Sequence, residues 1–144
     1  MSNEDARRPS TPDPEEMNSA LDDRMGIQVV EASPERVVGT MPVEGNTQPI
    51  GLLHGGASVV LAETLGSTGS WLHAQQFGKI PVGVDINATH HRGPRSGVVT
   101  GVATPAHLGR SQATYEVVIT DEDDKRVCTA RITCALISAE RAGL

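Results

Sequence analysis

The segment between Gln48 and Ser67 holds the side chains whose types and spacing could do chemistry. It contains the run His54-Gly55-Gly56, and Glu63 follows about two helical turns later. Glycines at a helix start leave backbone N–H groups accessible, and these groups have no partner within the helix and carry partial positive charge. Such a group can hold a carbonyl oxygen that becomes negative in a transition state. The Gly55 N–H is the candidate donor.

Glu63 stands inside an otherwise apolar helical pattern, where a carboxylate is costly unless it is paired, hydrated or used. Ser67 follows four residues later on the same face, so its hydroxyl could orient the carboxylate or a water. Each feature also has an ordinary interpretation. His54 could merely cap a helix, Glu63 could lie at the surface or pair with an arginine, and Gln48 could be a plain loop residue. Their combination within one short segment favours a functional interpretation.

The elements that must position these residues follow from the apolar periodicity. Gly56 to Phe77 is the strongest predicted helix, with an apolar stripe and a second face of small residues at four-residue spacing. A first helix is predicted from Asp13 to about Met25, with Glu16 completing a capping box and Gly26 as its end. Extended segments are predicted at 27–31, 36–43, 82–92, 98–107, 112–120 and 126–138.

This order of elements predicts the fold class. Five or six strands and one mostly apolar helix fit an α+β fold in which an antiparallel sheet curls around that helix. The sequence shows no internal repeat and no linker. Residues 13–138 are therefore predicted to form one domain, between a disordered tail at 1–12 and a loose tail at 139–144.

The bulk composition bounds the class of function. The 144 residues carry a formal net charge of −6 without a basic stripe, which gives no support to nucleic-acid binding. The sequence contains neither an apolar leader nor a stretch long enough to span a membrane, so a cytoplasmic location is expected. One Trp, one Tyr and one Phe leave a thin aliphatic core that would gain from burial between subunits. Cys128 and Cys134 lie six residues apart in one predicted strand, too far apart for a disulfide.

The same segment carries a resemblance to hotdog-fold acyl-CoA thioesterases of the branch with its acidic residue on the central helix. That branch includes the 4-hydroxybenzoyl-CoA, phenylacetate-pathway and menaquinone-pathway 1,4-dihydroxy-2-naphthoyl-CoA thioesterases. The similarity extends from about Met25 to Ile137. Its motifs are Gln48…Gly51-Leu52-Leu53-His54-Gly55-Gly56-Ala57-Ser58…Leu61-Ala62-Glu63…Gly66-Ser67, Asp85-Ile-Asn87-Ala-Thr-His90 and Ala106-His107-Leu108-Gly109-Arg110.

The resemblance implies a hydrolase that releases CoA and a free acid from an aryl- or other hydrophobic acyl-CoA. Glu63 would act as nucleophile, giving a mixed anhydride, or as general base toward water. The Gly55 N–H would polarise the thioester carbonyl, and Gln48 would bind the same oxygen or position the acyl group. His54 would assist near the thioester or hold the loop, and Ser67 would orient water or the carboxylate.

The resemblance also implies an assembly and a way of holding the substrate. The site would lie between two subunits of a homotetramer built as a dimer of dimers, with Glu63 from one subunit and the loop residues from the other. No metal or separate cofactor is expected, because coenzyme A is part of the substrate. Candidates to meet its phosphates are Gly109, Arg110 and Ser111, and a second cluster of His90, His91 and Arg92, although either could be an ordinary solvated strand end.

Two other classes of function are open to the same fold. One is a non-catalytic protein that binds acyl-CoA without turning it over, which would be expected to lack an acid at the position of Glu63. The other is a hydratase or dehydratase, which needs a differently placed acid–base pair acting on the carbon chain. The sequence does not show that motif.

Overall fold

The computed structural model describes residues 14–144, so the predictions for the tail at 1–12 and for Asp13 lie outside the described residues. Among these residues, none of the helices is long and apolar enough to cross a membrane. The elements, in chain order, are η1 (Pro14–Met17), α1 (Ala20–Met25), β1 (Gln28–Ser33), β2 (Arg36–Pro42), α2 (Gly55–Ala74), η2 (Gln75–Phe77), β3 (Lys79–His90), β4 (Val98–Leu108), β5 (Gln112–Thr120) and β6 (Arg126–Ser138).

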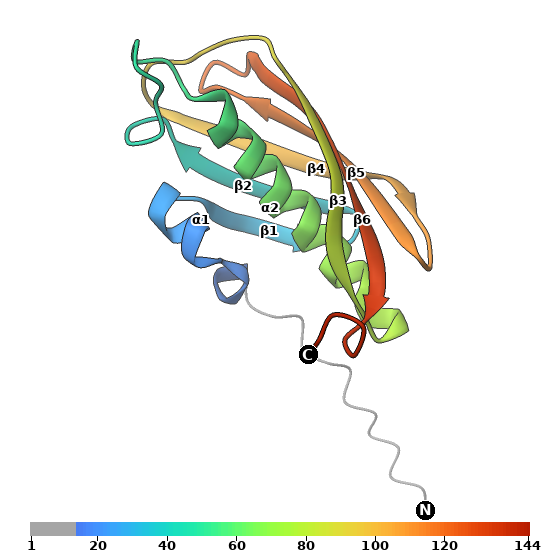
Figure 1. The fold of residues 1–144 in the computed structure, drawn as a ribbon. Coiled ribbons are helices and arrows are strands. Elements are labelled where there is room, and N and C mark those ends of the chain that lie inside the picture. The colour runs from blue at the N-terminus through green and yellow to red at the C-terminus, as the bar shows by residue number, and fades with distance from the viewer. Residues whose placement is uncertain (1–13) are drawn as a thin grey trace, which may run out of the picture.

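The strands form one six-stranded antiparallel sheet in the order β1-β2-β4-β5-β6-β3. The sheet curls around α2, and α1 lies against α2 near β1 (Figure 1). The predicted α+β hotdog architecture is therefore confirmed, and so are the long central helix and all six strands. The largest difference in a strand is at β3, which begins at Lys79, three residues before the predicted start.

The prediction for the first helix was wrong at its start. The chain first makes the short 3-10 turn η1, and α1 begins only after Ser19, whose backbone is extended. Ser19 and Asp22 form the capping box: the Ser19 Oγ accepts a hydrogen bond from the Asp22 N–H at 3.2 Å, and Asp22 Oδ2 accepts one from the Ser19 N–H at 2.9 Å. Gly26 ends the helix as predicted, in a left-handed conformation with φ 73°.

The central helix approaches the sheet closely because its contact face is built from small residues. A Cβ added at Gly66 would lie 2.1 Å from Ile132 Cγ2, and one at Gly69 would lie 2.6 Å from the Tyr115 ring. The sheet also has small residues under Leu65. A Cβ on Gly39 or on Gly101 would lie 2.6 Å from the Leu65 side chain. The predicted small face is thus the face that the sheet wraps.

Adding a side chain at Gly66, where the helix approaches the sheet closely, should destabilise the protein. In an unhindered helix Gly→Ala stabilises by about 1 kcal/mol. Here the new methyl would overlap Ile132, so we expect Gly66→Ala to lower the free energy of unfolding by about 2 kcal/mol in urea titrations.

A double-mutant cycle provides the control. Leucine in place of Ile132 lacks the Cγ2 branch, so Gly66→Ala should lower the free energy of unfolding about 1 kcal/mol less in an Ile132→Leu background. An equal loss in both backgrounds would show that the overlap is not the cause.

Candidate active site

Glu63 lies on α2 with its carboxylate turned toward β3. A Cβ at Gly83 of β3 would lie 2.7 Å from Glu63 Oε1, so a side chain there would displace the carboxylate. The pairing of β3 with β6 is irregular between Gly83 and Asp85, at this same point. Glu63 is half-buried, and its burial raises the pKa of the carboxyl above its ordinary value. A carboxylate of raised pKa is a stronger base.

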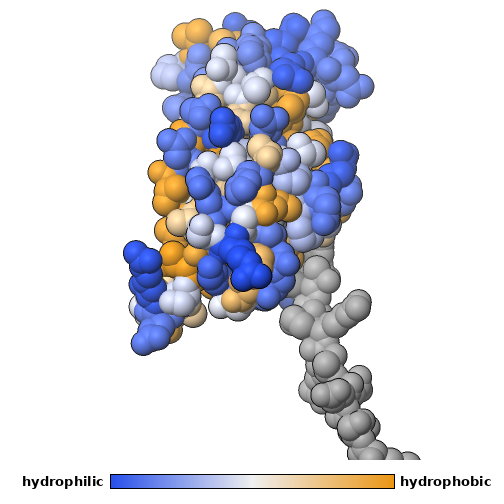
Figure 2. All heavy atoms as spheres, turned by 90° about the vertical axis from the view of Figure 1, so that its right-hand side faces the viewer, coloured by the Kyte–Doolittle hydropathy of each residue, from blue (hydrophilic) through white to orange (hydrophobic). Residues whose placement is uncertain are grey.

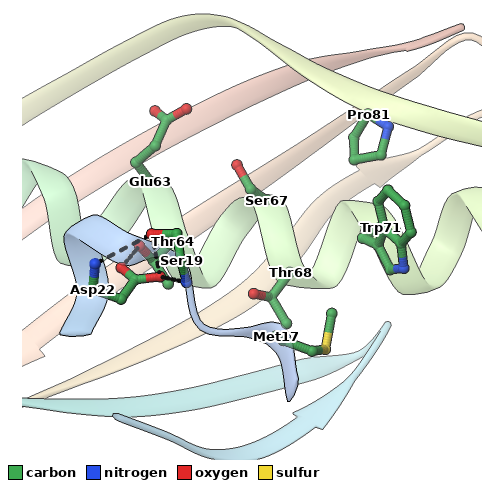
Figure 3. A pocket seen from close by; sticks show the side chains of 9 residues that line it. All are labelled: Met17, Ser19, Asp22, Glu63, Thr64, Ser67, Thr68, Trp71 and Pro81. Carbon is green, nitrogen blue, oxygen red and sulfur yellow. Dashed lines mark hydrogen bonds between the residues drawn. The ribbon is translucent and has the colours of Figure 1, made fainter. Parts of the chain in front are cut away.

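Glu63 lines a cleft of about 330 Å³ between α2, β3 and the N-terminal segment (Figure 3). Ser67 lines the same cleft and, like Glu63, points toward β3. In the described part of the chain no hydrogen bond joins the Ser67 hydroxyl to the Glu63 carboxylate. The other lining residues are Met17, Ser19, Asp22, Thr64, Thr68, Trp71 and Pro81.

The contribution of the N-terminal segment was not predicted from the sequence. Asp22 is buried, and its Oδ1 accepts a hydrogen bond from the hydroxyl of Thr64, the residue after Glu63, at 2.6 Å. This bond fixes α1 beside the face of α2 that carries Glu63. The Ser-x-x-Asp spacing could have located the cap, but no local signal pairs Asp22 with a residue forty-two positions away.

The start of α2 has the predicted open backbone donor. His54 is the N-cap residue, and its Nδ1 accepts a hydrogen bond from the Gly56 N–H at 2.8 Å, so the capping interpretation of His54 is confirmed. The Gly55 N–H donates to no acceptor within residues 14–144. A Cβ at Gly55 would lie 2.9 Å from Nε2 of His90, so the glycine also lets the end of β3 pack closely.

Gly55 faces a second cleft of about 370 Å³, which is also lined by Gln48 and by residues 90–93. Gln48 shapes the loop before α2, because its Oε1 accepts hydrogen bonds from the N–H groups of Ile50 at 2.6 Å and Leu52 at 3.4 Å. The acceptor end of the amide is thereby occupied. Its Nε2 donor end has no acceptor among the described residues and could serve a carbonyl oxygen.

Within one chain the two halves of the predicted site are apart. Glu63 and Gly55 lie eight residues apart on one helix, which corresponds to about 12 Å along its axis. The structure brings Glu63 together with Ser67, and it brings Gln48 and Gly55 together with residues 90–92. It does not bring the first group to the second.

The two predicted phosphate-binding clusters lie at opposite ends of α2. His73, near the C-terminal end, contacts the carbonyl oxygen of Gly109 through Nε2 at 2.6 Å, and the Arg110 guanidinium lies 5.6 Å from the centre of the Phe77 ring. His90 lies beside Gly55 at the N-terminal end, about 27 Å away along the axis. One chain therefore cannot place both clusters on a single CoA.

The charged groups of both clusters already have local contacts. Arg92 Nε lies 3.8 Å from Asp121 Oδ2, and His91 Nε2 lies 2.9 Å from the hydroxyl of Thr129. Ser111 is exposed, and its carbonyl accepts the Leu136 N–H. Within residues 14–144 no group of three or more His, Cys, Asp or Glu side chains is arranged to hold a metal ion.

Comparison with known proteins gives a consistent set of relatives. Residues 50–128 match the thioesterase superfamily. The proofreading thioesterase EntH of Cronobacter turicensis is 45% identical over 118 residues, which cover 81% of this chain and 85% of that protein. A mutant of thioesterase PA1618 from Pseudomonas aeruginosa superposes with a TM-score of 0.83 at 42% identity, covering 90% of this chain and 96% of that one.

Two mutant structures of one Staphylococcus aureus protein are also similar. One carries alanine in place of a glutamine, with a TM-score of 0.79 at 31% identity over 83% of this chain and 99% of that one. The other carries alanine in place of a glutamate, with a TM-score of 0.77 at 32% identity over 81% of this chain and 97% of that one.

The raised pKa of Glu63 should be visible in the stability of the protein. A carboxyl whose pKa is raised on folding stabilises the fold below its unfolded pKa, and this contribution is lost as the pH rises through the folded pKa. Glu63→Gln should therefore be more stable than the wild type at neutral pH. The difference should vanish as the pH falls to the ordinary carboxyl range.

Urea unfolding of both proteins across this pH range measures the effect. Glu116→Gln, which removes an exposed carboxylate from β5, controls for the loss of charge alone. A Glu63→Gln difference that stays constant with pH would contradict the assignment.

Two substitutions of His54 test whether this residue stabilises the protein as the N-cap of α2. Alanine cannot accept from the Gly56 N–H, so His54→Ala should lower the free energy of unfolding by about 1 kcal/mol. Asparagine is a good N-cap residue, so His54→Asn should retain most of that stability. Equal losses in the two variants, measured by chemical denaturation, would argue against capping.

Proposed function

Because the chain belongs to the thioesterase superfamily and is a thioester hydrolase, we propose that it hydrolyses an acyl-CoA at a site completed by a second copy of itself. Glu63 of one copy is the catalytic carboxylate, and Gln48 and the Gly55 N–H of the other copy hold the carbonyl oxygen. The observation that carries the proposal is the division of these groups between two clefts of one chain.

The edge strand β3 is the surface that suits a second copy. It is twelve residues long, and among residues 14–144 it pairs only with β6. Its exposed side chains include Val82 and Val84, whose exposed fractions are 43% and 62%. A long apolar strand edge is a template for pairing with another chain. Figure 2, which views the molecule from the right-hand side of Figure 1, shows hydrophobic residues interspersed among polar ones on that face.

The contacts of β3 also support one pairing that would complete the site. Gly83 lies against Glu63, and His90 lies against Gly55. If two copies of β3 pair antiparallel about a two-fold axis at Asn87, and the pairing skips one residue between Gly83 and Asp85 as it does against β6, Gly83 of each copy falls opposite His90 of the other. Each Glu63 then faces the open N–H of the second copy. A two-fold interface of this kind forms two equivalent sites, and two such dimers make the expected tetramer.

The chemistry follows from the groups so assembled. The Glu63 carboxylate either attacks the thioester carbonyl carbon or takes a proton from a water that attacks it. The carbonyl oxygen becomes negative and is stabilised by the Gly55 N–H, which donates to no other acceptor within residues 14–144. The C–S bond then breaks, the CoA sulfur leaves and takes up a proton, and water supplies the oxygen of the free acid. On the nucleophilic route, that water cleaves the mixed anhydride.

A relative supports the pairing of the two key residues. The glutamine and the glutamate replaced in the two Staphylococcus aureus structures are separated by the same number of residues as Gln48 and Glu63.

Both routes need Glu63 ionised, and burial raises its pKa, so hydrolysis should weaken as the pH falls through the raised value. The acyl group that we favour is aryl or otherwise hydrophobic.

Mixed oligomers provide the decisive experiment. Glu63→Ala and Gln48→Ala should each hydrolyse benzoyl-CoA far more slowly than the wild type, by at least about 10²-fold for the carboxylate. Co-expressed with different tags and purified through both, the mixed dimer has one site with both residues intact. It should recover about half of the wild-type rate.

The matched control is a mixed dimer of Glu63→Ala with Glu63→Gln, in which no site is intact. Absence of recovery in the first mixture would show that each chain holds a complete site. Wild-type turnover by Glu63→Ala would remove that residue from the mechanism.

A further inference from the structure

We propose that Met17 and Trp71 form the end wall of the cleft that Glu63 lines, and that this cleft holds the acyl group of the substrate. The N-terminal segment would then limit the acyl group to about the size of one aromatic ring. This inference rests on the proposed function, since it takes Glu63 as the reacting end of the cleft. It concerns which substrates fit rather than how they react.

The lining of the cleft changes in character along α2. Beside Glu63 it is polar, with the hydroxyls of Thr64 and Ser67 and the carboxylate of Asp22. Two turns further on it is apolar. Figure 3 shows Met17, Trp71 and Pro81 gathered with Thr68 at the end of the cleft away from Glu63. A thioester with its carbonyl at the carboxylate would direct its hydrocarbon part to this apolar end.

Part of the flat apolar Trp71 side chain is exposed to solvent. Its exposed fraction is 37%, and it is the single tryptophan of the chain. Met17 approaches from η1, an element that packs against β1. An aromatic face and a flexible thioether are suited to hold a ring between them.

The segment that carries Met17 is fixed in place, so it can act as a wall. The Asn18 side chain donates to the Ile27 carbonyl at 2.8 Å, and Asp22 accepts from the Thr64 hydroxyl at 2.6 Å. At the far end of α1, the Asn46 side chain donates to the Met25 carbonyl at 2.7 Å. Displacing Met17 would disturb these contacts.

The dimensions of the cleft agree with a small acyl group. Glu63 and Trp71 lie eight residues apart on α2, about 12 Å along the axis. The cleft volume of about 330 Å³ lies at the low end for sites that bind small molecules. A single ring fits this space, whereas a long straight chain would meet Met17 and Trp71.

Substrate preference tests the wall directly. The ratio of kcat/KM for dodecanoyl-CoA to that for benzoyl-CoA should rise about tenfold in Met17→Ala and in Trp71→Ala. Leu21→Ala is the matched control, because Leu21 lies on α1, is 48% exposed and does not line the cleft. A ratio unchanged in both variants, with benzoyl-CoA still hydrolysed, would overturn the inference and leave the proposed function standing.

A second measurement does not depend on turnover. S-phenacyl-CoA is a thioether analogue that cannot be hydrolysed, and Trp71 is the sole tryptophan reporter. The analogue should change the Trp71 emission, whereas CoA alone should not. Calorimetric binding of the analogue without an emission change would overturn the wall. An emission change in a protein that hydrolyses no acyl-CoA would support the wall formed by Met17 and Trp71 and would contradict the proposed function.

Discussion

The close contact between α2 and the curled sheet is the constraint on which the rest of the structure depends. Gly66 and Gly69 allow the helix backbone to approach Ile132 and Tyr115, while Leu65 fills the space over Gly39 and Gly101. Those two glycines face each other across β2 and β4, so one large side chain packs over a matched pair of small ones. Because the approach is so close, the rotation of α2 about its axis is fixed, and with it the direction in which Glu63 points.

Much of the fold could be predicted because its signals are local and long. The strands have regular alternation over many residues, and α2 has a continuous apolar stripe, so both were located correctly. The first helix was placed wrongly because two capping boxes compete within a few residues. The Ser19 box, with its carboxylate buried and bonded to Thr64, forms in the structure. That carboxylate gains a tertiary partner that local spacing cannot reveal.

The site was predicted in part for the same reason. Residue types and helical spacing indicate Glu63, Gly55 and His54, and the structure confirms the open N–H and the cap. The catalytic roles of these residues stay predictions. Gly83 was not identified, although it determines the space beside the carboxylate, because it reaches Glu63 from a strand that begins after the helix has ended. Met17 and Trp71 were missed likewise, since a wall made by two remote elements leaves no pattern in either.

The burial of both cysteines has a practical consequence. Cys128 and Cys134 are free thiols inside the sheet, and burial raises the pKa of each sulfur above its ordinary value. Since the thiolate is the reactive form, these side chains are protected both by low ionisation and by lack of access. The chain contains no other cysteine. In a colorimetric assay with an aromatic disulfide reagent, the folded protein would contribute almost no background, and the colour that develops would come from coenzyme A set free.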